Sequence, residues 1–188
     1  LWLPINSVRS LPDMEIAPFW YILPIAFLLD LILGDPRWLP HPIRWMGGWI
    51  ERWEPYFRKL PCGLTASGCL FAISLVIGTF IITWGILFIA NAIHLSLYII
   101  MQIVFIYYTL SVKSLRSASM DLYRTLKCGK LQEAKYKLSH IVGRDVEPLD
   151  EQGVMRGTVE SVAENLVDGV ISPLVFAAVG GAPLALTY

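Results

Sequence analysis

One long stretch of the chain is apolar and carries no charge. No Asp, Glu, Lys or Arg occurs in the 53 residues from Leu60 to Val112, whose strongly polar residues are Asn91, His94 and Gln102. Because one membrane span needs about 20 apolar residues, we expect two spans here, 64–90 and 93–112. They would form a transmembrane hairpin over 64–112 with a tight turn near Asn91–His94. A buried helix pair of a soluble protein would show a polar stripe every three or four residues, and this stretch shows none.

Two further apolar segments flank this hairpin. Residues 16–34 carry the single charge Asp30 and predict another span, in which Pro24 introduces a kink. Residues 170–188 are also apolar, but they are interrupted by Pro173, Gly180, Gly181 and Pro183. We expect a broken or re-entrant helix there, which a membrane tolerates only where neighbouring helices cover the freed backbone.

The intervening segments are amphipathic and polar. The 35–62 loop ends at the hairpin, and 113–169 forms a second polar segment with expected helices at 113–128, 130–142 and 150–167. Gly129 is a stop signal for the first helix and Asp150 an N-cap for the third. Their lysines indicate solvated faces: Lys127, Lys130, Lys135 and Lys137. The predicted fold is therefore all-α, a single polytopic integral membrane domain with cytoplasmic amphipathic helices.

Composition and charge exclude several classes of protein. The 188 residues include 15 Lys+Arg and 15 Asp+Glu, with 55% apolar and 16% charged side chains. A disordered chain would be less hydrophobic and a soluble domain would carry about 25% charged residues. Zero net charge argues against a nucleic-acid binder. The three cysteines form no disulfide framework and are expected to be free thiols.

The distribution of basic residues predicts an orientation. Fourteen of the fifteen lie in 35–62 and 113–169, two segments that the hairpin places on the same side of the membrane. The positive-inside rule makes that side cytoplasmic. We therefore expect a multi-pass protein of the cytoplasmic (inner) membrane with its active face in the cytoplasm. The chain begins with Leu1, and Met14 just before the first span is the expected natural start, with 1–13 as upstream sequence.

Three carboxylates recur at helical spacing in the last polar segment. Glu160, Glu164 and Asp168 stand at i, i+4 and i+8, and like charges at that spacing repel unless something offsets them. A hard cation such as Mg²⁺ takes oxygen ligands and would do so, with Asn165 as an added donor. The alternative is an exposed acidic face that Arg156 partly neutralises.

A proline-rich loop follows the first span. Three prolines in the Asp35–Pro42 stretch restrict the backbone and hold Asp35, Arg37 and His41 at the membrane surface. Such a loop positions a phosphate or a metal, or is an ordinary helix connection. The tryptophans and tyrosine that follow are typical of an aromatic belt on an interfacial helix: Trp38, Trp45, Trp49, Trp53 and Tyr56.

No standard nucleotide-binding motif is present, whether a P-loop or a dinucleotide fingerprint. Three separate motifs, in this order, carry a resemblance instead: Asp30–Pro36 continuing through Pro40–Gly47, then Ile141–Asp145, then Thr158–Gly169. Over about residues 27–188 the chain resembles the adenosylcobinamide-phosphate synthase family of cobalamin biosynthesis (CbiB/CobD type). Members of that family continue further, so the resemblance implies an N-terminal portion, and its independent activity stays open.

The resemblance implies a membrane-bound ligase that forms a C–N (amide) bond. It would join adenosylcobyric acid to aminopropanol or its phosphate with ATP and Mg²⁺. We assign hypothetical roles on that basis: metal binding to Glu160, Glu164 and Asp168, phosphate or substrate binding to Arg37, Arg144 and Asn165, and amine orientation or proton acceptance to Asp35 and His41. The expected partners are the corrinoid, the amine and the bilayer, with an oligomer or other pathway enzymes as further candidates.

The alternative function is a non-enzymatic membrane protein, either a transporter or a sensor-like partner of an enzyme. A transporter places ionisable groups inside its spans, whereas here the ionisable groups gather in the two polar segments. This distribution favours catalysis at the cytoplasmic face.

Overall fold

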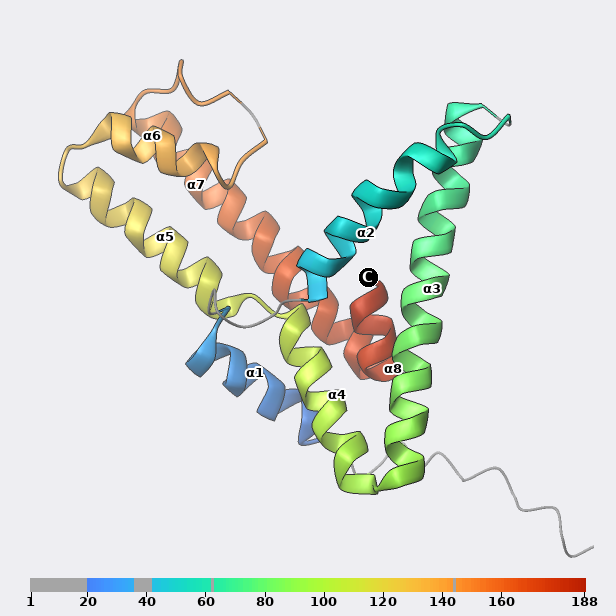
Figure 1. Ribbon diagram of the computed structural model, residues 1–188. Coiled ribbons are helices and arrows are strands. Elements are labelled where there is room, and N and C mark those ends of the chain that lie inside the picture. Colours follow the sequence, from blue (N-terminus) through green and yellow to red (C-terminus); the bar gives the residue numbers. More distant parts are fainter. Residues whose placement is uncertain (1–19, 36–41, 62, 144) are drawn as a thin grey trace, which may run out of the picture.

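The structure, a computed structural model, describes residues 20–35, 42–61, 63–143 and 145–188 (Figure 1). Every regular element in these ranges is a helix, as predicted. In chain order they are α1 (Ile22–Leu33), α2 (Pro42–Phe57), α3 (Leu64–Ile93), α4 (Leu95–Thr109), α5 (Val112–Lys127), α6 (Leu131–Ser139), α7 (Glu151–Leu166), the π-helical turn η1 (Val167–Ile171) and α8 (Ser172–Thr187).

The predicted hairpin is present, with a turn of one residue. Only His94 leaves the helical region (φ −164°, ψ 138°), and its Nδ1 accepts a hydrogen bond from the Ser96 N–H at 3.1 Å. In the part of the chain that the structure describes, three helical stretches are long and apolar enough to cross a membrane: Leu64–Ile93, Leu95–Lys127 and Glu151–Thr187. The large apolar side chains along α3 are mostly exposed, which suits a helix whose surroundings are lipid.

Helix α1 is shorter than the span predicted over 16–34, which lies partly outside the described residues. Its 12 residues extend about 18 Å, less than the roughly 30 Å of a hydrocarbon core. Pro24 lies in its first turn, where proline does not disrupt the helix, so the predicted kink is absent. Helix α1 packs against α4.

The broken apolar segment is confirmed. Non-helical backbone at Gly180 and Gly181 (φ 67°) divides α8. The freed Ala182 N–H donates to Gln102 Oε1 at 2.8 Å, and Gln102 Nε2 donates to the Tyr98 hydroxyl at 2.9 Å. A Cβ on Gly181 would lie 3.0 Å from Gln102 Nε2. The buried amide of α4 therefore supplies the hydrogen bond that α8 loses at its break.

The helices form two groups, each with its own apolar core (Figure 1). The membrane bundle comprises α1, α3, α4 and α8. The helical lobe comprises α5, α6 and α7 and projects from the end of the bundle opposite the α3–α4 turn. Fully buried members of the lobe core are Leu122, Leu138 and Val154.

Boundaries within the lobe follow the sequence signals closely. Gly129 (φ 73°) ends α5, with its N–H bonded to the Leu126 carbonyl at 2.8 Å. Asp150 caps α7 by accepting from the Gly153 N–H at 2.7 Å. The expectation that the lysines are solvated is wrong for Lys135, which is 7% exposed and donates to the Glu147 carbonyl at 2.6 Å. Its ammonium anchors the loop after α6.

Helix α2 is amphipathic and contacts α3 near its own C-terminal end. The Ser67 hydroxyl of α3 donates to the Phe57 carbonyl at 2.5 Å, and the Phe57 and Phe71 rings lie 4.8 Å apart. Trp45, Trp49 and Trp53 are exposed. The helix therefore presents the aromatic surface that an interfacial position would use, and that position stays a prediction.

Candidate functional site

Described residues from each of the three sequence motifs meet around the first turns of α5, where the lobe joins the bundle. Asp30 and Asp35 come from the end of α1, Ile141 from the loop after α6, and Asn165 and Gly169 from the end of α7 and from η1. Each motif is bonded to α5 or lines its surface. The junction is therefore built from segments up to about 140 residues apart in the chain.

Asp30 ties α1 to the N-terminus of α5. Its carboxylate is 0% exposed and accepts from the Val112 N–H at 2.6 Å and the Lys113 N–H at 3.4 Å. In return, Lys113 Nζ donates to the carbonyls of Ile32 (2.5 Å) and Leu33 (3.1 Å) at the end of α1. Each charge lies at the helix terminus that its sign favours, so the two helix ends stabilise each other.

Two further contacts fix the start of the proline-rich loop. Gly34 has φ 62°, and a Cβ there would lie 2.8 Å from Cδ of Lys113. The Tyr107 hydroxyl of α4 donates to the Gly34 carbonyl. Ser114 donates its hydroxyl proton to Asp35 Oδ2 at 2.7 Å. Asp35 is therefore held beside α5.

Gly169 joins η1 to the link between α4 and α5. Its carbonyl accepts from the Ser111 N–H at 3.1 Å and from the Ser111 hydroxyl at 3.2 Å. A Cβ on Gly169 would collide with Ser111 Oγ. The chain passes between bundle and lobe twice, at the α4–α5 link and at η1, and these bonds hold the two connections together. The connection at η1 is a π-helical turn, a feature frequent at functional sites.

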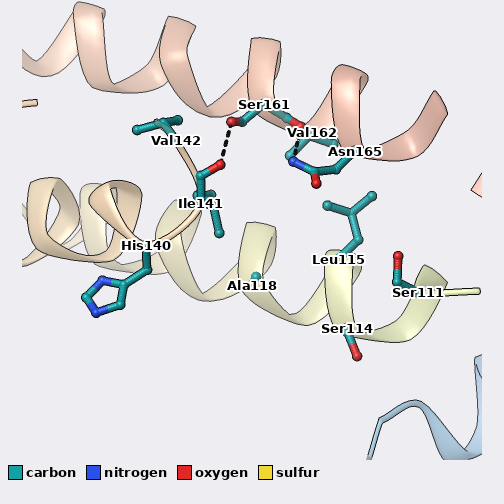
Figure 2. A pocket seen from close by; sticks show the side chains of 10 residues that line it. All are labelled: Ser111, Ser114, Leu115, Ala118, His140, Ile141, Val142, Ser161, Val162 and Asn165. Atoms are coloured by element: carbon teal, nitrogen blue, oxygen red, sulfur yellow. Dashed lines mark hydrogen bonds between the residues drawn. The ribbon is translucent and has the colours of Figure 1, made fainter. Parts of the chain in front are cut away.

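A cleft of about 440 Å³ lies between α5 and α7 and is closed at one end by the loop after α6 (Figure 2). Its polar lining comprises Ser111, Ser114, His140, Ser161 and Asn165, and its apolar lining comprises Leu115, Ala118, Ile141, Val142 and Val162. Figure 2 shows the Ser111 hydroxyl directed toward α7 and the imidazole of His140 turned away from α7. No Lys, Arg, Asp or Glu lines the cleft among the residues placed by the structure.

The three predicted metal-binding carboxylates do not line this cleft. Glu160 accepts from Arg156 Nε at 2.8 Å, Glu164 is exposed, and Asp168 Oδ1 accepts from the Tyr188 hydroxyl at 3.1 Å. Asp168 lies inside the π-helical turn, where the α-helical i, i+4 register no longer holds. Within the described ranges, no group of three or more His, Cys, Asp or Glu side chains could hold a metal ion.

The remaining predicted residues divide into two sets. Asn165 lines the cleft and donates from Nδ2 to the Ser161 carbonyl at 2.8 Å. Asp35 is not among the lining residues, but it accepts a hydrogen bond from Ser114, which is. Arg37, His41 and Arg144 lie outside the described residues, so their roles stay predictions.

Sequence reasoning missed several residues that organise the junction. The sequence marks Asp30 as the one charge of a span and as part of a motif but assigns it no role, although an ionisable residue within an apolar span is itself a functional signal. Nothing local marks Ser111 or Lys113, because their partners are 58 and about 80 residues away in the chain. Only the fold identifies them.

Comparison with known proteins identifies the family. The family model described as CobD/Cbib protein matches residues 23–188. The cobalamin biosynthesis proteins CobD of Clostridium perfringens and of Halalkalibacterium halodurans are 42% and 41% identical over 165 residues, and CbiB of Salmonella typhimurium is 40% identical over 167.

Each of these alignments covers 87% of this chain and 51% or 52% of the relative. The chain therefore spans about half the length of the curated relatives it matches. No solved structure matches it. The match over 23–188 includes all three motifs at the junction, and the chain belongs to the CobD/CbiB protein family.

Proposed function

We propose that the protein containing this chain forms an amide bond in cobalamin biosynthesis. It would join the carboxylate of adenosylcobyric acid to the amino group of aminopropanol or its phosphate and consume ATP. The single observation that carries this proposal is the meeting of the three family motifs at one junction beside a cleft. The names of the relatives, cobalamin biosynthesis proteins, support the pathway.

The chemistry requires activation of a carboxylate. The carboxylate oxygen attacks the γ-phosphorus of ATP and releases ADP, and the amine then attacks the acyl carbon and releases phosphate. Cationic groups must stabilise the charge that develops on the transferred phosphoryl group, and we assign this role to Arg37 and Arg144. Asp35, beside the cleft, would accept the proton that the amine loses, with His41 as a second candidate.

A magnesium ion would fit the exposed carboxylates of α7 and η1 only together with other ligands. Mg²⁺ is commonly bound by one or two carboxylates together with substrate phosphates and water. Glu164 is exposed and Asp168 accepts from one neutral hydroxyl, so both carboxylates would be able to bind the ion. Glu160 instead forms a salt bridge with Arg156. The ion would supply charge neutralisation on the triphosphate.

We further propose that the lobe and the cleft face the cytoplasm. All the basic residues that follow the hairpin belong to the polar segment from Lys113 to Arg156, and α5, α6 and α7 lie at one end of the bundle (Figure 1). By the positive-inside rule, this end of the bundle would then face the cytoplasm. Substrates and ATP would approach from the same side.

The test is an assay of ATP consumption by the purified protein in detergent. We expect ADP release only when adenosylcobyric acid and the amine are supplied together. Glu164→Gln should lower the rate by roughly 10²-fold or more if the carboxylate acts in phosphoryl transfer. Substrate flux across vesicles without amide product would instead favour a transporter.

A further inference from the structure

The serine hydroxyls on the lining of the α5–α7 cleft already donate to protein acceptors. Ser111 donates its hydroxyl proton to Gly169 O (3.2 Å), Ser161 to Ile141 O (3.1 Å) and Ser114 to Asp35 Oδ2 (2.7 Å). A hydroxyl has one proton and two lone pairs. What these side chains can still offer a ligand is therefore acceptor capacity.

Asn165 adds the most accessible acceptor. Its Nδ2 donates to the Ser161 carbonyl, and its Oδ1 has no donor in the described part of the chain. Figure 2 shows this oxygen on the side of Asn165 that faces α5. The side chain is exposed, so a ligand entering the cleft can reach Oδ1.

The described lining of the cleft offers an anion no cationic side chain. His140 lies 2.7 Å through Nδ1 from the Tyr136 carbonyl, and since a carbonyl only accepts, this nitrogen carries the proton and donates away from the cleft. Among the described lining groups, a phosphate would meet mainly oxygen lone pairs, which repel it.

Size and apolar lining restrict the ligand further. A volume of about 440 Å³ lies near the lower end of the range for small-molecule sites, and a corrinoid with its side chains is far larger than such a site. Leu115, Ala118 and Val162 form an apolar wall that suits a short alkyl chain. The ligand is therefore small, donor-rich and partly apolar.

We propose that this cleft binds the amine substrate as a short amino alcohol. Its ammonium and hydroxyl donate to Asn165 Oδ1 and to the lone pairs of Ser111 and Ser161, its alkyl part contacts the apolar wall, and any phosphate it carries stays outside with the corrinoid. This assignment rests on the proposed amide-forming function, because that reaction is what requires an amine. It makes Asn165 a residue that selects the amine.

The test measures binding of aminopropanol to the purified protein by calorimetry, without ATP or corrinoid. Propane-1,2-diol, which lacks the ammonium, is the comparison ligand and should bind at least about 10-fold more weakly. Asn165→Leu removes the acceptor at similar size and should weaken aminopropanol binding about 10-fold or more. Asn165→Asp keeps an oxygen acceptor and adds negative charge, so it should bind the cation as well as wild type or better.

Asn91→Leu is the matched control, because it makes the same change on an exposed residue at the far end of α3, and it should leave binding unchanged. Thermal unfolding of each variant checks that it folds. As a second measurement, Asn165→Leu should raise KM for the amine and leave KM for the corrinoid within about twofold.

The outcomes separate this proposal from the proposed function. Aminopropanol binding that depends on Asn165 supports the amine site even if no amide is formed. Amide formation with an amine KM unchanged in Asn165→Leu would overturn the site and leave the function standing. Weaker amine binding in Asn165→Asp than in Asn165→Leu would also overturn it, since it would show that the cleft receives negative charge.

Discussion

At the scale of single residues, the junction depends on a few groups whose partners are distant in the chain. Asp30 and Lys113 exchange helix-capping bonds between α1 and α5, and Gly169 holds the two connections between bundle and lobe together through Ser111. The sequence could indicate that Asp30, Asp35 and Gly169 belong to motifs. It could not indicate their partners, because these contacts form only after helices separated by 58 to 83 residues have packed.

Replacing Asp30 tests the cap on α5. Asp30→Ala removes both acceptor bonds and should lower the free energy of unfolding by about 1–3 kcal/mol. Asp30→Asn keeps one acceptor oxygen and should cost less. Thermal unfolding in detergent measures both. Equal stability of Asp30→Ala and wild type would show that the bonds to Val112 and Lys113 contribute nothing.

The contact between Gly169 and Ser111 predicts a coupled pair. Gly169→Ala introduces a methyl group against Ser111 Oγ and should destabilise the protein by about 1–3 kcal/mol. Ser111→Gly removes the obstructing hydroxyl, so Gly169→Ala should cost much less in that background. A double-mutant cycle on unfolding measures the coupling; strictly additive effects would contradict the collision.

At the scale of elements, helix boundaries were predictable where the signals are local. Gly129 and Asp150 mark ends that the structure confirms, and the uncharged run marks the hairpin. Helix α1 ends at Leu33, next to the predicted end of the 16–34 span, and the first four residues of that span lie outside the described residues, so its N-terminal limit stays a prediction. The π-helical turn has no sequence signature that α-helical periodicity would detect.

Gln102 should be essential for the broken helix α8. Gln102→Leu leaves the buried Ala182 N–H without its acceptor, which should cost about 1–3 kcal/mol of stability. Gln132→Leu, the same change on an exposed residue of α6, is the matched control and should be near neutral. If both variants unfold at the wild-type temperature, the Ala182 N–H does not depend on Gln102.

The contact between α5 and α6 predicts a pH dependence of stability. Hydrogen bonds from Lys137 and Lys130 lower the pKa of Glu133, and bonds to Asp121 and Glu133 raise the pKa of Lys137. The stabilisation that comes with the lowered pKa of Glu133 is fully present above its ordinary pKa of 4.5, and it is lost as the pH falls through the lowered pKa. The stabilisation that comes with the raised pKa of Lys137 is fully present below its ordinary pKa of 10.5, and it is lost as the pH rises through the raised pKa.

The variant Lys137→Met separates these contributions from other titrations. Its unfolding temperature should fall below that of wild type by a constant amount between about pH 5 and pH 10, and the gap should narrow outside that window. Because the groups are exposed, the gap should be small and should shrink with added salt. A gap that does not change with pH would exclude an ionic origin.

At the scale of the whole molecule, the distribution of charge predicted the division into bundle and lobe. Residues 60–112 lack charge and form the hairpin, and the charged segment 113–169 forms most of the lobe. The cleft was not predictable, because its lining is mainly uncharged serine, asparagine and small apolar residues that no motif distinguishes. The sequence directed attention to the carboxylates of α7 and η1, which do not line the cleft.

The proposed orientation can be measured with one cysteine. Cys128 is exposed at the end of α5. In a protein with Cys62 and Cys69 replaced by alanine, a membrane-impermeant maleimide should label Cys128 in inside-out vesicles but not in intact cells. Asn91→Cys in a cysteine-free background should show the reverse. Labelling of Cys128 in intact cells would place the lobe on the other side.

The central claim is that motifs distant in sequence act as one amide-forming site. The most direct measurement is amide product by mass spectrometry for Asp35→Asn, Glu164→Gln and the double variant. We predict that each single change lowers kcat by about 10²-fold or more and that the double variant is little worse than the more impaired single variant, because groups acting as a unit are non-additive. Wild-type rates in either single variant, or losses that multiply in the double variant, would contradict the claim.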